Sequence, residues 1–407
     1  MNIVYVHQYF LTPRQGGAVR SYHLAKGLVD AGAQVDVITA HNQAHYDIQW
    51  VDGIRVHYLP VSYKNEYSFI KRVIAFLTFV RQSKRLLQKL ARPDLLYITS
   101  TPLTTGLIGI WAKRRLAVPF FFEVRDLWPE APIQMGIVNH PILKSLLYRM
   151  ERRIYQEAIH LVALSPGIRE ALVRACPGKA VSYIPNFVDT SFFQTSERSL
   201  TDHSDGSLPR KPLTISYVGA IGRVNGLSAF LDLAEEVLKA GKHWRFVLMG
   251  KGASLPHLYE VVRAKGLTNV EFRPFGNKRA VREQLARSDF AYLSFLPLPV
   301  LESSSPNKFF DALAMGVPIV VNFKGWIADL VQQHEIGVLQ GNPLWRTVQQ
   351  IEALYQHPTE WKSASQQARE LAERQFSKEK AVSVLCSLLL QANSPGKMAS
   401  GAYNRIA

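Results

Sequence analysis

The segment Glu302–Asp311 contains the residues of this sequence best suited to bind an anion. Ser305 is a natural helix N-cap and Pro306 suits the first helical position, so we expect a helix to begin here with free backbone N–H groups. Lys308 falls in the first turn, where the helix dipole disfavours a cation, which indicates a bound anion. Asp311 shares its helix face, so this face could hold a phosphate and a ribose. The alternative is an ordinary capped helix with a surface lysine.

Two glycine-containing loops follow expected strands in the two halves of the chain. Gly16 and Gly17 stand between the first strand and its helix, and Gly219 and Gly222 repeat this arrangement, with Arg223 next to them. Glycines let backbone N–H groups approach a ligand at a helix N-terminus, and an arginine can bind phosphate with two hydrogen bonds. The alternative is a pair of structural turns with a solvated arginine.

A charged string follows a strongly apolar run in the first half. Glu123, Arg125 and Asp126 place three charges in four residues directly after the aromatic run 120–122, and Glu130 follows. Asp126 or Glu130 could accept a proton or bind sugar hydroxyls. The alternative is a buried Arg125–Asp126 ion pair that closes the strand.

Short apolar runs alternate with amphipathic runs, which predicts a doubly wound α/β fold. Residues 1–185 and 213–377 each carry this pattern, 186–212 is polar and is interpreted as a linker, and 378–407 is a helix with a frayed tail. Ligands bind beyond the carboxyl ends of such strands, so we expect the site in a cleft between the halves. The expected strands are Ile3–Val6, Val35–Ala40, Ile54–Leu59, Leu95–Thr99, Phe120–Val124, Leu161–Leu164, Leu213–Val218, Arg245–Met249, Val270–Phe275, Phe290–Phe295 and Pro318–Asn322.

Composition and missing motifs narrow the classes of protein. The 407 residues carry a net charge of +16, which predicts an anionic partner, and two cysteines cannot form a disulfide framework. We interpret the N-terminus as a buried strand rather than a signal peptide, and the uncharged stretch 95–112 as a strand and a helix rather than a membrane span. The chain has no P-loop, no zinc-protease motif and no Asp-x-Asp. A diphosphate site without a metal would need cations and helix termini, which Arg223 and Lys308 would supply together with the helix at Pro306.

In these segments the sequence resembles the family 4 retaining glycosyltransferases, which have the GT-B fold of two Rossmann-like domains. It is most similar to the subgroup that builds bacterial surface polysaccharides, such as colanic acid and O-antigen. The resemblance covers about residues 1–390 and rests on the Gly16-Gly17 turn, Arg125–Glu130, Gly219–Gly226 and Ser305–Gly316. It implies a nucleotide-sugar donor bound by the second half, an acceptor bound by the first half and no cofactor.

The resemblance also implies roles for individual residues. Arg223 and Lys308 would stabilise the departing diphosphate, Asp311 would bind the ribose, and Gly17 would let the backbone approach the phosphate and sugar. The implied acceptor residues are Arg20, Arg125 and Glu130. The remaining implied donor contacts are Gly16, Gly219, Gly222, Gly250, Phe275, Gly276, Asn277, Ser303, Ser304, Ser305 and Asn307.

The sequence departs from the family pattern at three places. The first of the family's two glutamates falls at Ser303, with Glu302 one residue away, and the second is Asp311. Asn225 replaces a lysine in the glycine loop, so Arg223 must carry more of the phosphate charge. The family's histidine after the fifth strand is missing, and we expect Asp126 to take over its polar contacts to the sugar.

The stretch 63–92 is basic and rich in apolar residues, which is typical of a helix that binds a membrane surface. The alternative is a helix packed on the sheet with a solvated basic face. The expected membrane contacts are Lys71, Arg72, Phe76, Phe79, Arg81, Lys84 and Arg85.

The sequence thus predicts a cytoplasmic, metal-independent glycosyltransferase, peripherally attached to the inner face of the cell membrane. The expected partners are a UDP-sugar donor, with an N-acetylated amino sugar suggested by the subgroup, a lipid-linked saccharide acceptor and an anionic membrane surface. One alternative is a non-transferring GT-B enzyme such as a UDP-N-acetylglucosamine 2-epimerase. A nucleic-acid-binding protein is disfavoured because only the net charge suggests it.

Overall fold

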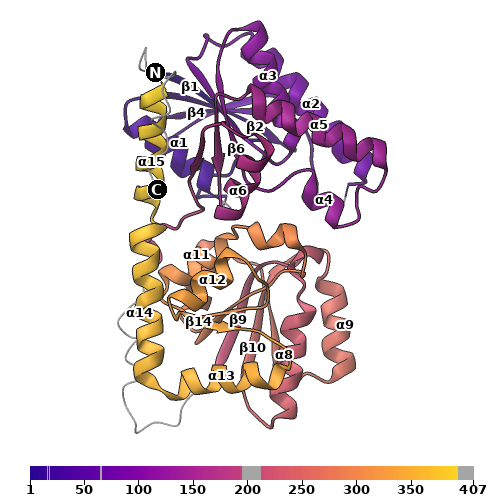
Figure 1. Cartoon of the computed structure of the whole chain (residues 1–407), viewed down its shortest axis with the longest axis vertical. Helices are drawn as coiled ribbons and strands as arrows, with labels where there is room; N and C mark the ends of the chain where they lie inside the picture. The colour runs from indigo at the N-terminus through magenta and orange to yellow at the C-terminus, as the bar shows by residue number, and fades with distance from the viewer. Residues whose placement is uncertain (16, 18, 65–66, 195–211, 393–407) are drawn as a thin grey trace. The chain divides into compact units, whose positions relative to one another are not determined.

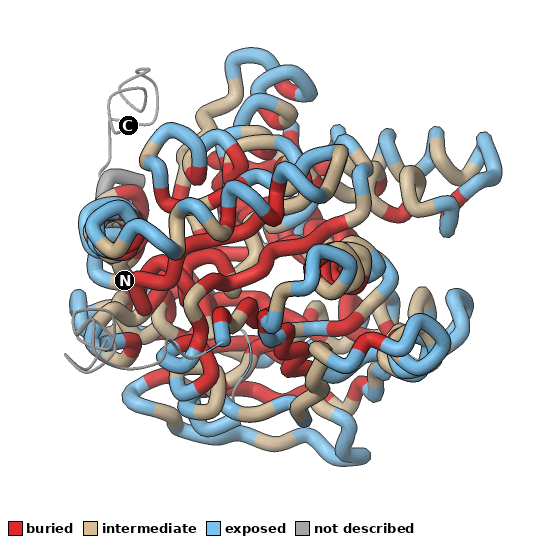
Figure 2. Tube along the Cα trace, turned by 90° about the horizontal axis from the view of Figure 1, so that it is seen from below, coloured by how far each residue is buried: buried red, intermediate tan, exposed pale blue. Residues whose placement is uncertain are grey.

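The computed structural model describes residues 1–15, 17, 19–64, 67–194 and 212–392, and it divides the chain into two compact units. The first unit comprises Met1–Pro185, Ser303–Ser305 and the C-terminal residues from Glu379, and the second comprises Asn186–Glu302 and Pro306–Lys378. The strands of both units are mainly buried, whereas the outer turns of the helices are exposed (Figures 1 and 2). Of the expected linker 186–212, residues 195–211 lie outside the described part, as does the expected tail from residue 393.

The first unit is built on an eight-stranded sheet with the order β3-β4-β2-β1-β5-β6-β7-β8. Every neighbouring pair is parallel except β3 and β4, which form an antiparallel edge. The strands are β1 (Asn2–Val6), β2 (Gln34–His41), β3 (Asp47–Val51), β4 (Ile54–Pro60), β5 (Leu95–Thr99), β6 (Phe120–Val124), β7 (His160–Ala163) and β8 (Val181–Tyr183).

Helices cover both faces of this sheet. Successive side chains of β1 point to opposite faces of the sheet. Val4 and Val6 join an apolar core with residues of α2, α3, α5 and α6. On the other face, the Tyr5 hydroxyl donates a hydrogen bond to Ser21 of α1. Beside α1 lies the C-terminal helix α15, with Gly27 closely approached by Val382 (Figure 1). The helices are α1 (Arg20–Asp30), α2 (Phe69–Leu87), η1 (Leu103–Thr105), α3 (Gly106–Arg115), α4 (Glu130–Gln134), α5 (Pro141–Glu157), α6 (Pro166–Ala175) and α15 (Lys378–Ala392).

The second unit has a parallel six-stranded sheet with the order β11-β10-β9-β12-β13-β14. Its strands are β9 (Thr214–Ala220), β10 (Arg245–Lys251), β11 (Val270–Pro274), β12 (Phe290–Leu293), β13 (Ile319–Val321) and β14 (Gly337–Leu339). Its helices are η2 (Arg223–Asn225), α8 (Ser228–Lys239), α9 (Leu255–Lys265), α10 (Lys278–Leu285), η3 (Pro299–Ser303), α11 (Asn307–Ala314), α12 (Trp326–Gln333), α13 (Leu344–Gln356) and α14 (Pro358–Gln375).

The structure confirms the expected α/β alternation and corrects several local expectations. It adds β3, β8 and β14, of which β3 pairs antiparallel. Helix α11 begins at Asn307, and its cap residue Pro306 has an extended backbone and no side-chain hydrogen bond, so Ser305 is not the N-cap. Among the described residues, no helix combines the length and apolar character needed to cross a bilayer.

Candidate functional site

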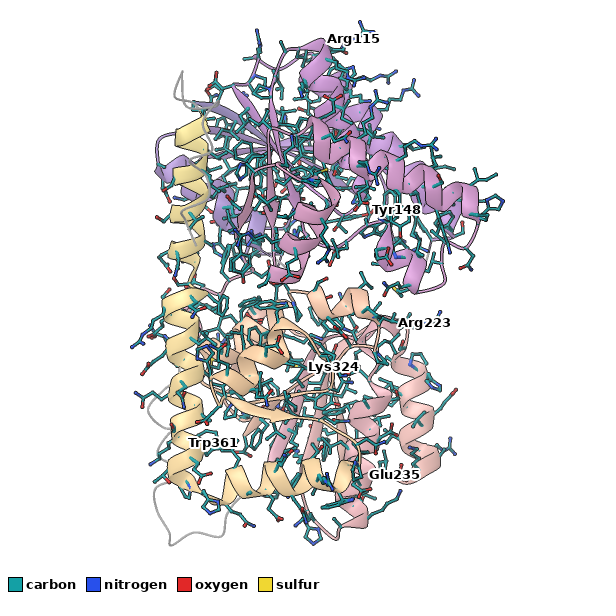
Figure 3. The ribbon with its side chains drawn as sticks, in the orientation of Figure 1. Arg115, Tyr148, Arg223, Glu235, Lys324 and Trp361 are labelled. Carbon is teal, nitrogen blue, oxygen red and sulfur yellow. The ribbon has the colours of Figure 1, made fainter. Side chains whose placement is uncertain are left out.

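The loop after β9 is a compact turn that leaves Arg223 exposed. Gly219 has φ +150°, in the region that favours glycine, and Asn225 Oδ1 accepts a hydrogen bond from Gly222 N at 3.1 Å. Asn225, which replaces a cation of the family pattern, is therefore a buried part of the turn. Arg223 extends from the edge of this unit and forms no ion pair with any described residue, so its guanidinium can bind a ligand (Figure 3).

Lys308 lies beside this loop, held by an aromatic side chain. Its Nζ donates a hydrogen bond to the Tyr217 hydroxyl at 2.5 Å and lies 4.0 Å from the centre of the Tyr217 ring. A Cβ atom at Gly219 would be 3.2 Å from Lys308 Cε, so the glycine leaves room for the lysine stem. Burial lowers the pKa of Lys308 to about 7. A neighbouring anion would therefore decide its charge.

Asp311 shares a helix face with Lys308, as the spacing predicts, but its carboxylate is paired with Lys278. Lys278 Nζ donates to Asp311 Oδ1 at 2.9 Å and to Oδ2 at 2.7 Å, and Asp311 is buried. Lys278 begins α10, directly after the expected base-binding loop. The ion pair thus joins the expected ribose-binding carboxylate to that loop.

The loop 275–277 closes tightly against its own unit. A Cβ atom at Gly276 would be 2.4 Å from Ala280 Cβ, and Asn277 Oδ1 caps α10 by accepting from Ala280 N at 3.0 Å. Phe275 is exposed, with Lys251 Nζ 4.8 Å from its ring centre. On the neighbouring strand, a Cβ atom at Gly250 would be 2.0 Å from Gly219 O. Gly250 therefore lets β10 approach the Gly219 turn closely.

The segment before α11 contains further expected donor residues. Glu302 lies in η3, Ser303 is buried at its end, and Ser304 and Ser305 are half-buried. Asn307 is the first residue of α11 and is also half-buried. Gly325 passes so close to Glu302 that a Cβ atom would be 2.3 Å from the Glu302 carbonyl oxygen. The backbone of Glu302 is thus fixed by α12, while its carboxylate forms no ion pair with the described residues.

In the first unit, the strand ends of β1 and β6 bring together His7, Arg125 and Asp126. Arg125 Nη1 donates to His7 Nε2 at 3.3 Å, and burial together with the Arg125 charge lowers the pKa of His7. Asp126 is exposed and accepts from Thr101 Oγ1 at 3.4 Å. No Arg125–Asp126 ion pair forms among the described residues, so both side chains remain able to contact a ligand. Gly17 has φ +80°, and Gly16 lies outside the described residues.

The structure corrects the expectation that Arg20 binds the acceptor. Its side chain is buried, and it donates to Glu123 Oε2 at 3.0 Å and to Ile184 O at 2.9 Å. Burial alone would raise the pKa of Glu123, but the Arg20 guanidinium holds it below its usual value. Tyr97 also donates to Glu123, at 2.7 Å. Arg20 therefore neutralises a buried carboxylate of the first unit and is not available to an acceptor.

Glu130, an expected acceptor residue, is half-buried and forms hydrogen bonds within the first unit. Its carboxylate accepts from Gln134 Nε2 at 2.7 Å and from the Tyr148 hydroxyl of α5. Burial, together with the hydrogen bond to Glu130 and its charge, raises the pKa of Tyr148 to about 12. Glu130 thus ties α4 to α5.

Helix α2 exists as expected, but Phe79 is wrong as a membrane contact, and Phe76 is half-buried. Phe79 is 0% exposed in the core, and Phe76 packs against the Tyr63 ring with centres 5.6 Å apart. The exposed apolar residues of α2 are Phe69, Ile70, Ile74 and Leu77. Of the expected cations, Lys71, Arg81 and Arg85 are exposed, whereas Arg72 and Lys84 are half-buried.

Three side chains that contact the expected site residues were not predicted from the sequence. Tyr217 holds Lys308, Lys278 holds Asp311, and His7 contacts Arg125. Tyr217 lies inside an apolar strand run, so the sequence offered only a core interpretation. His7 and Lys278 each stand directly after an expected strand end or loop, and that position is the signal that could have found them.

Comparison with known proteins agrees with this two-part organisation. The model of the glycosyl transferase 4-like domain matches residues 15–186, and that of the glycosyl transferases group 1 matches residues 212–357. No curated protein sequence matches significantly.

Solved structures show the same fold at low sequence identity. Sucrose-phosphate synthase (tll1590) from Thermosynechococcus elongatus is 15% identical, with a TM-score of 0.78 over 96% of this chain and 98% of that one. Anabaena Alr3699/HepE in complex with UDP-glucose is 16% identical, with a TM-score of 0.67 over 96% and 99%. WaaG, a glycosyltransferase involved in lipopolysaccharide biosynthesis, is 13% identical, with a TM-score of 0.66 over 94% and 99%. The chain is therefore a two-domain glycosyltransferase of the GT4 type with the GT-B fold.

Proposed function

We propose that the protein moves a sugar from a UDP-sugar to a lipid-linked saccharide, with retention of configuration, in the synthesis of a surface polysaccharide such as O-antigen or exopolysaccharide. The proposed sugar is an N-acetylated amino sugar, and the place of action is the cytoplasmic face of the membrane. The observation that carries the proposal is the Lys308–Tyr217 pair beside the Gly219 turn, a cationic position ready for a diphosphate. The solved relatives include HepE with UDP or UDP-glucose and starch synthase IV with ADP, which supports a nucleotide-sugar donor.

In the proposed reaction, the bond between the anomeric carbon and the diphosphate oxygen breaks, and the acceptor oxygen bonds to the same face of the sugar. The acceptor proton passes to the departing diphosphate. Arg223, Lys308 and the uncapped first turn of α11 stabilise the negative charge that develops there. These groups act without a metal in this proposal, which rests on the absence of Asp-x-Asp from the sequence.

The remaining roles are proposed from the family resemblance. Asp311 exchanges part of its Lys278 pairing for the ribose hydroxyls, while the backbone of 275–277 holds the base. Glu302 and Ser303 face the donor sugar, and Asp126 and Arg125 bind sugar hydroxyls. Unchanged turnover of an Asp126→Asn variant would contradict the proposed role of Asp126 in binding sugar hydroxyls.

Attachment to the membrane is proposed through α2. Its exposed apolar residues Ile70, Ile74 and Leu77 occur on the same helix as exposed Lys71, Arg81 and Arg85. Each cation near an anionic surface contributes roughly 1 kcal/mol, so a few of them suffice for peripheral binding. Such binding would bring the enzyme to a lipid-linked acceptor.

A thermal-shift panel of UDP, GDP, dTDP and ADP and their sugars tests the donor. The correct donor stabilises the protein by RT ln(1 + [L]/Kd), whereas the other bases give smaller shifts. The absence of a shift with every nucleotide contradicts the proposal. A UDP-N-acetylglucosamine 2-epimerase would convert its substrate without an acceptor, so a strict acceptor requirement separates the two functions.

A further inference from the structure

Helix α5 exposes an apolar end and a basic end along one stripe. Ile142, Leu146, Arg149 and Arg153 are spaced by four, three and four residues, which places them on one helix face. Ile142 is 73% exposed and Leu146 is 58% exposed, although α5 packs its other face on the core through Ile154 and Tyr155. Large apolar side chains so exposed on a helix indicate a surface that is covered in use.

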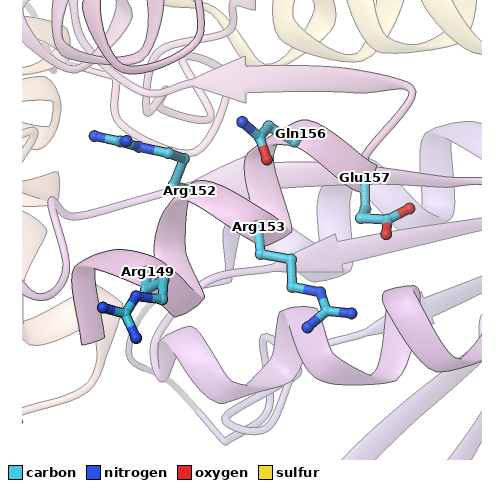
Figure 4. Close-up of a pocket in the computed structure, with 5 residues that line it drawn as sticks. All are labelled: Arg149, Arg152, Arg153, Gln156 and Glu157. Carbon is cyan, nitrogen blue, oxygen red and sulfur yellow. The ribbon is translucent and has the colours of Figure 1, made fainter. Parts of the chain in front are cut away.

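The basic end of the stripe is a hollow with an excess of positive charge. It is lined by Arg149, Arg152, Arg153, Gln156 and Glu157 (Figure 4). None of the three arginines forms an ion pair with a described residue. The only acid of the hollow, Glu157, accepts from Lys113 Nζ at 3.1 Å and from Arg114, so its charge is already neutralised from α3.

We propose that α5 is a lipid-contacting helix, with the Arg149–Arg152–Arg153 hollow binding the phosphate of an anionic lipid headgroup and Ile142 and Leu146 entering the acyl boundary. This inference rests on the proposed attachment to a membrane and adds a second contact besides α2. Arginine binds phosphate oxygens with two parallel hydrogen bonds.

The distance along the helix fits one bilayer surface. Arg149 follows Ile142 by seven positions, which is about 10 Å at the rise of an α-helix. Interfacial helices bury their apolar face roughly 5–10 Å into the boundary between headgroups and acyl chains. A helix inclined with its N-terminal end deeper would therefore place both ends of the stripe at their preferred depth. Helix α3 packs against α5, and its exposed Arg115 adds a further cation to the neighbouring surface.

Binding of the full-length protein to vesicles tests the proposal, with phosphatidylcholine vesicles compared with vesicles containing phosphatidylglycerol. The variants are Arg149→Gln/Arg153→Gln, Ile142→Ser/Leu146→Ser and the control Arg263→Gln/Arg287→Gln, which removes two exposed arginines from the second unit. Loss of Arg149 and Arg153 should weaken binding to anionic vesicles by about 30-fold and flatten its salt dependence. Loss of the apolar pair should weaken binding at every salt concentration and leave the salt dependence intact. The control should bind like the unmodified protein.

Equal weakening by the control pair would show a net-charge effect and overturn the proposal, as would unchanged binding of the Arg149→Gln/Arg153→Gln variant. Inorganic phosphate that displaces the protein from vesicles at constant ionic strength would show a free-anion site and overturn the lipid assignment. Nucleotide-sugar thermal shifts, measured on the same variants, should be unchanged. A failure of vesicle binding would therefore contradict the lipid proposal alone. A failure of the nucleotide-sugar thermal shifts would contradict the donor proposal alone.

Discussion

The Nζ atom of Lys308 lies 2.5 Å from the Tyr217 hydroxyl and 4.0 Å from the centre of its ring, in the second unit of the chain. The same hydroxyl donates to Ala220 O at 2.5 Å, so Tyr217 fixes both the lysine and the turn that carries Gly219. Because burial brings the pKa of Lys308 to about 7, this contact holds a cation whose charge depends on its ligand.

Removal of the Tyr217 hydroxyl should weaken donor binding more than it weakens the fold. Tyr217→Phe keeps the ring but frees Lys308, and we expect about tenfold weaker UDP binding, the usual size of one lost hydrogen bond. Isothermal titration measures it. Tyr292→Phe is the matched control, because Tyr292 lies on the neighbouring strand β12 and bonds to Gln340 at 2.6 Å. Equal effects of both changes on UDP binding would contradict a positioning role for Tyr217.

Donor binding should become weaker as the pH rises above 7. The folded pKa of Lys308 is depressed to about 7, so the free protein loses this charge above pH 7, while a diphosphate favours the charged form. We expect up to tenfold weaker binding per pH unit between pH 7.5 and 9, with uptake of about one proton per ligand at pH 8. Titration in buffers of different ionisation enthalpy measures this uptake. Lys308→Met should abolish this proton uptake, whereas Lys239→Gln, which changes an exposed lysine of α8, should not.

Asp311 should distinguish a ribose from a deoxyribose in the nucleotide. Asp311→Asn removes the negative charge, and we expect at least tenfold loss of the preference for UDP over 2′-deoxy-UDP, since a hydrogen bond to a charged group contributes about 1.5–3 kcal/mol. Thermal shifts with the two ligands measure it. Lys278→Met should instead lower the free energy of unfolding by about 1–3 kcal/mol and preserve the preference. If Lys278→Met lost the preference for UDP and Asp311→Asn kept it, ribose binding would be assigned to Lys278.

Glu151 should make stability depend on pH. Burial raises its pKa to about 7, while its carboxylate accepts from Tyr155 at 2.9 Å. A raised folded pKa means that the contribution to stability is complete below the unfolded pKa of about 4.5 and is lost as the pH rises through 7. Glu151→Gln should therefore raise the melting temperature at pH 8 and leave it nearly unchanged at pH 5. A gain of equal size at both pH values would contradict the assignment.

The two faces of α2 should respond differently to truncation. Phe79→Ala should cost about 3–5 kcal/mol of unfolding free energy, because Phe79 is wholly buried. Ile74→Ala should leave the melting temperature nearly unchanged but weaken vesicle binding, since Ile74 is 58% exposed. Thermal melts and vesicle sedimentation measure the two effects. A large loss of stability with Ile74→Ala would mean that this face packs within the protein.

The sequence predicted the parallel core well because buried strands are continuous apolar runs. Leu95–Thr99 and Phe120–Val124 agree residue for residue with β5 and β6. The edge strands β3 and β14 were missed, because exposed Ile48 and Trp50 break the expected pattern in β3 and β14 has only three residues. The start of α11 was misplaced because Ser305-Pro306 satisfies the capping preference, whereas Pro306 is extended and the helix begins one residue later.

Local patterns identified the loops of the candidate site but not the partners of their side chains. Nothing near Arg20 in the sequence shows that it pairs with Glu123, since the two are 103 positions apart. The same holds for Glu130, whose partner Tyr148 lies on the next helix, and for Lys308, whose partner Tyr217 is 91 positions away. Contacts between distant strands and helices decide which polar side chains remain available to a ligand.

Sugar transfer to an acceptor lipid tests the central claim most directly. The protein is incubated with radiolabelled UDP-sugars and a lipid extract that contains lipid-linked saccharides, and label is counted in the organic phase. We predict acceptor-dependent labelling that is lost in the Lys308→Met variant and retained in the Lys239→Gln control. Conversion or hydrolysis of the UDP-sugar without an acceptor, with no label in lipid from any donor, would contradict the account.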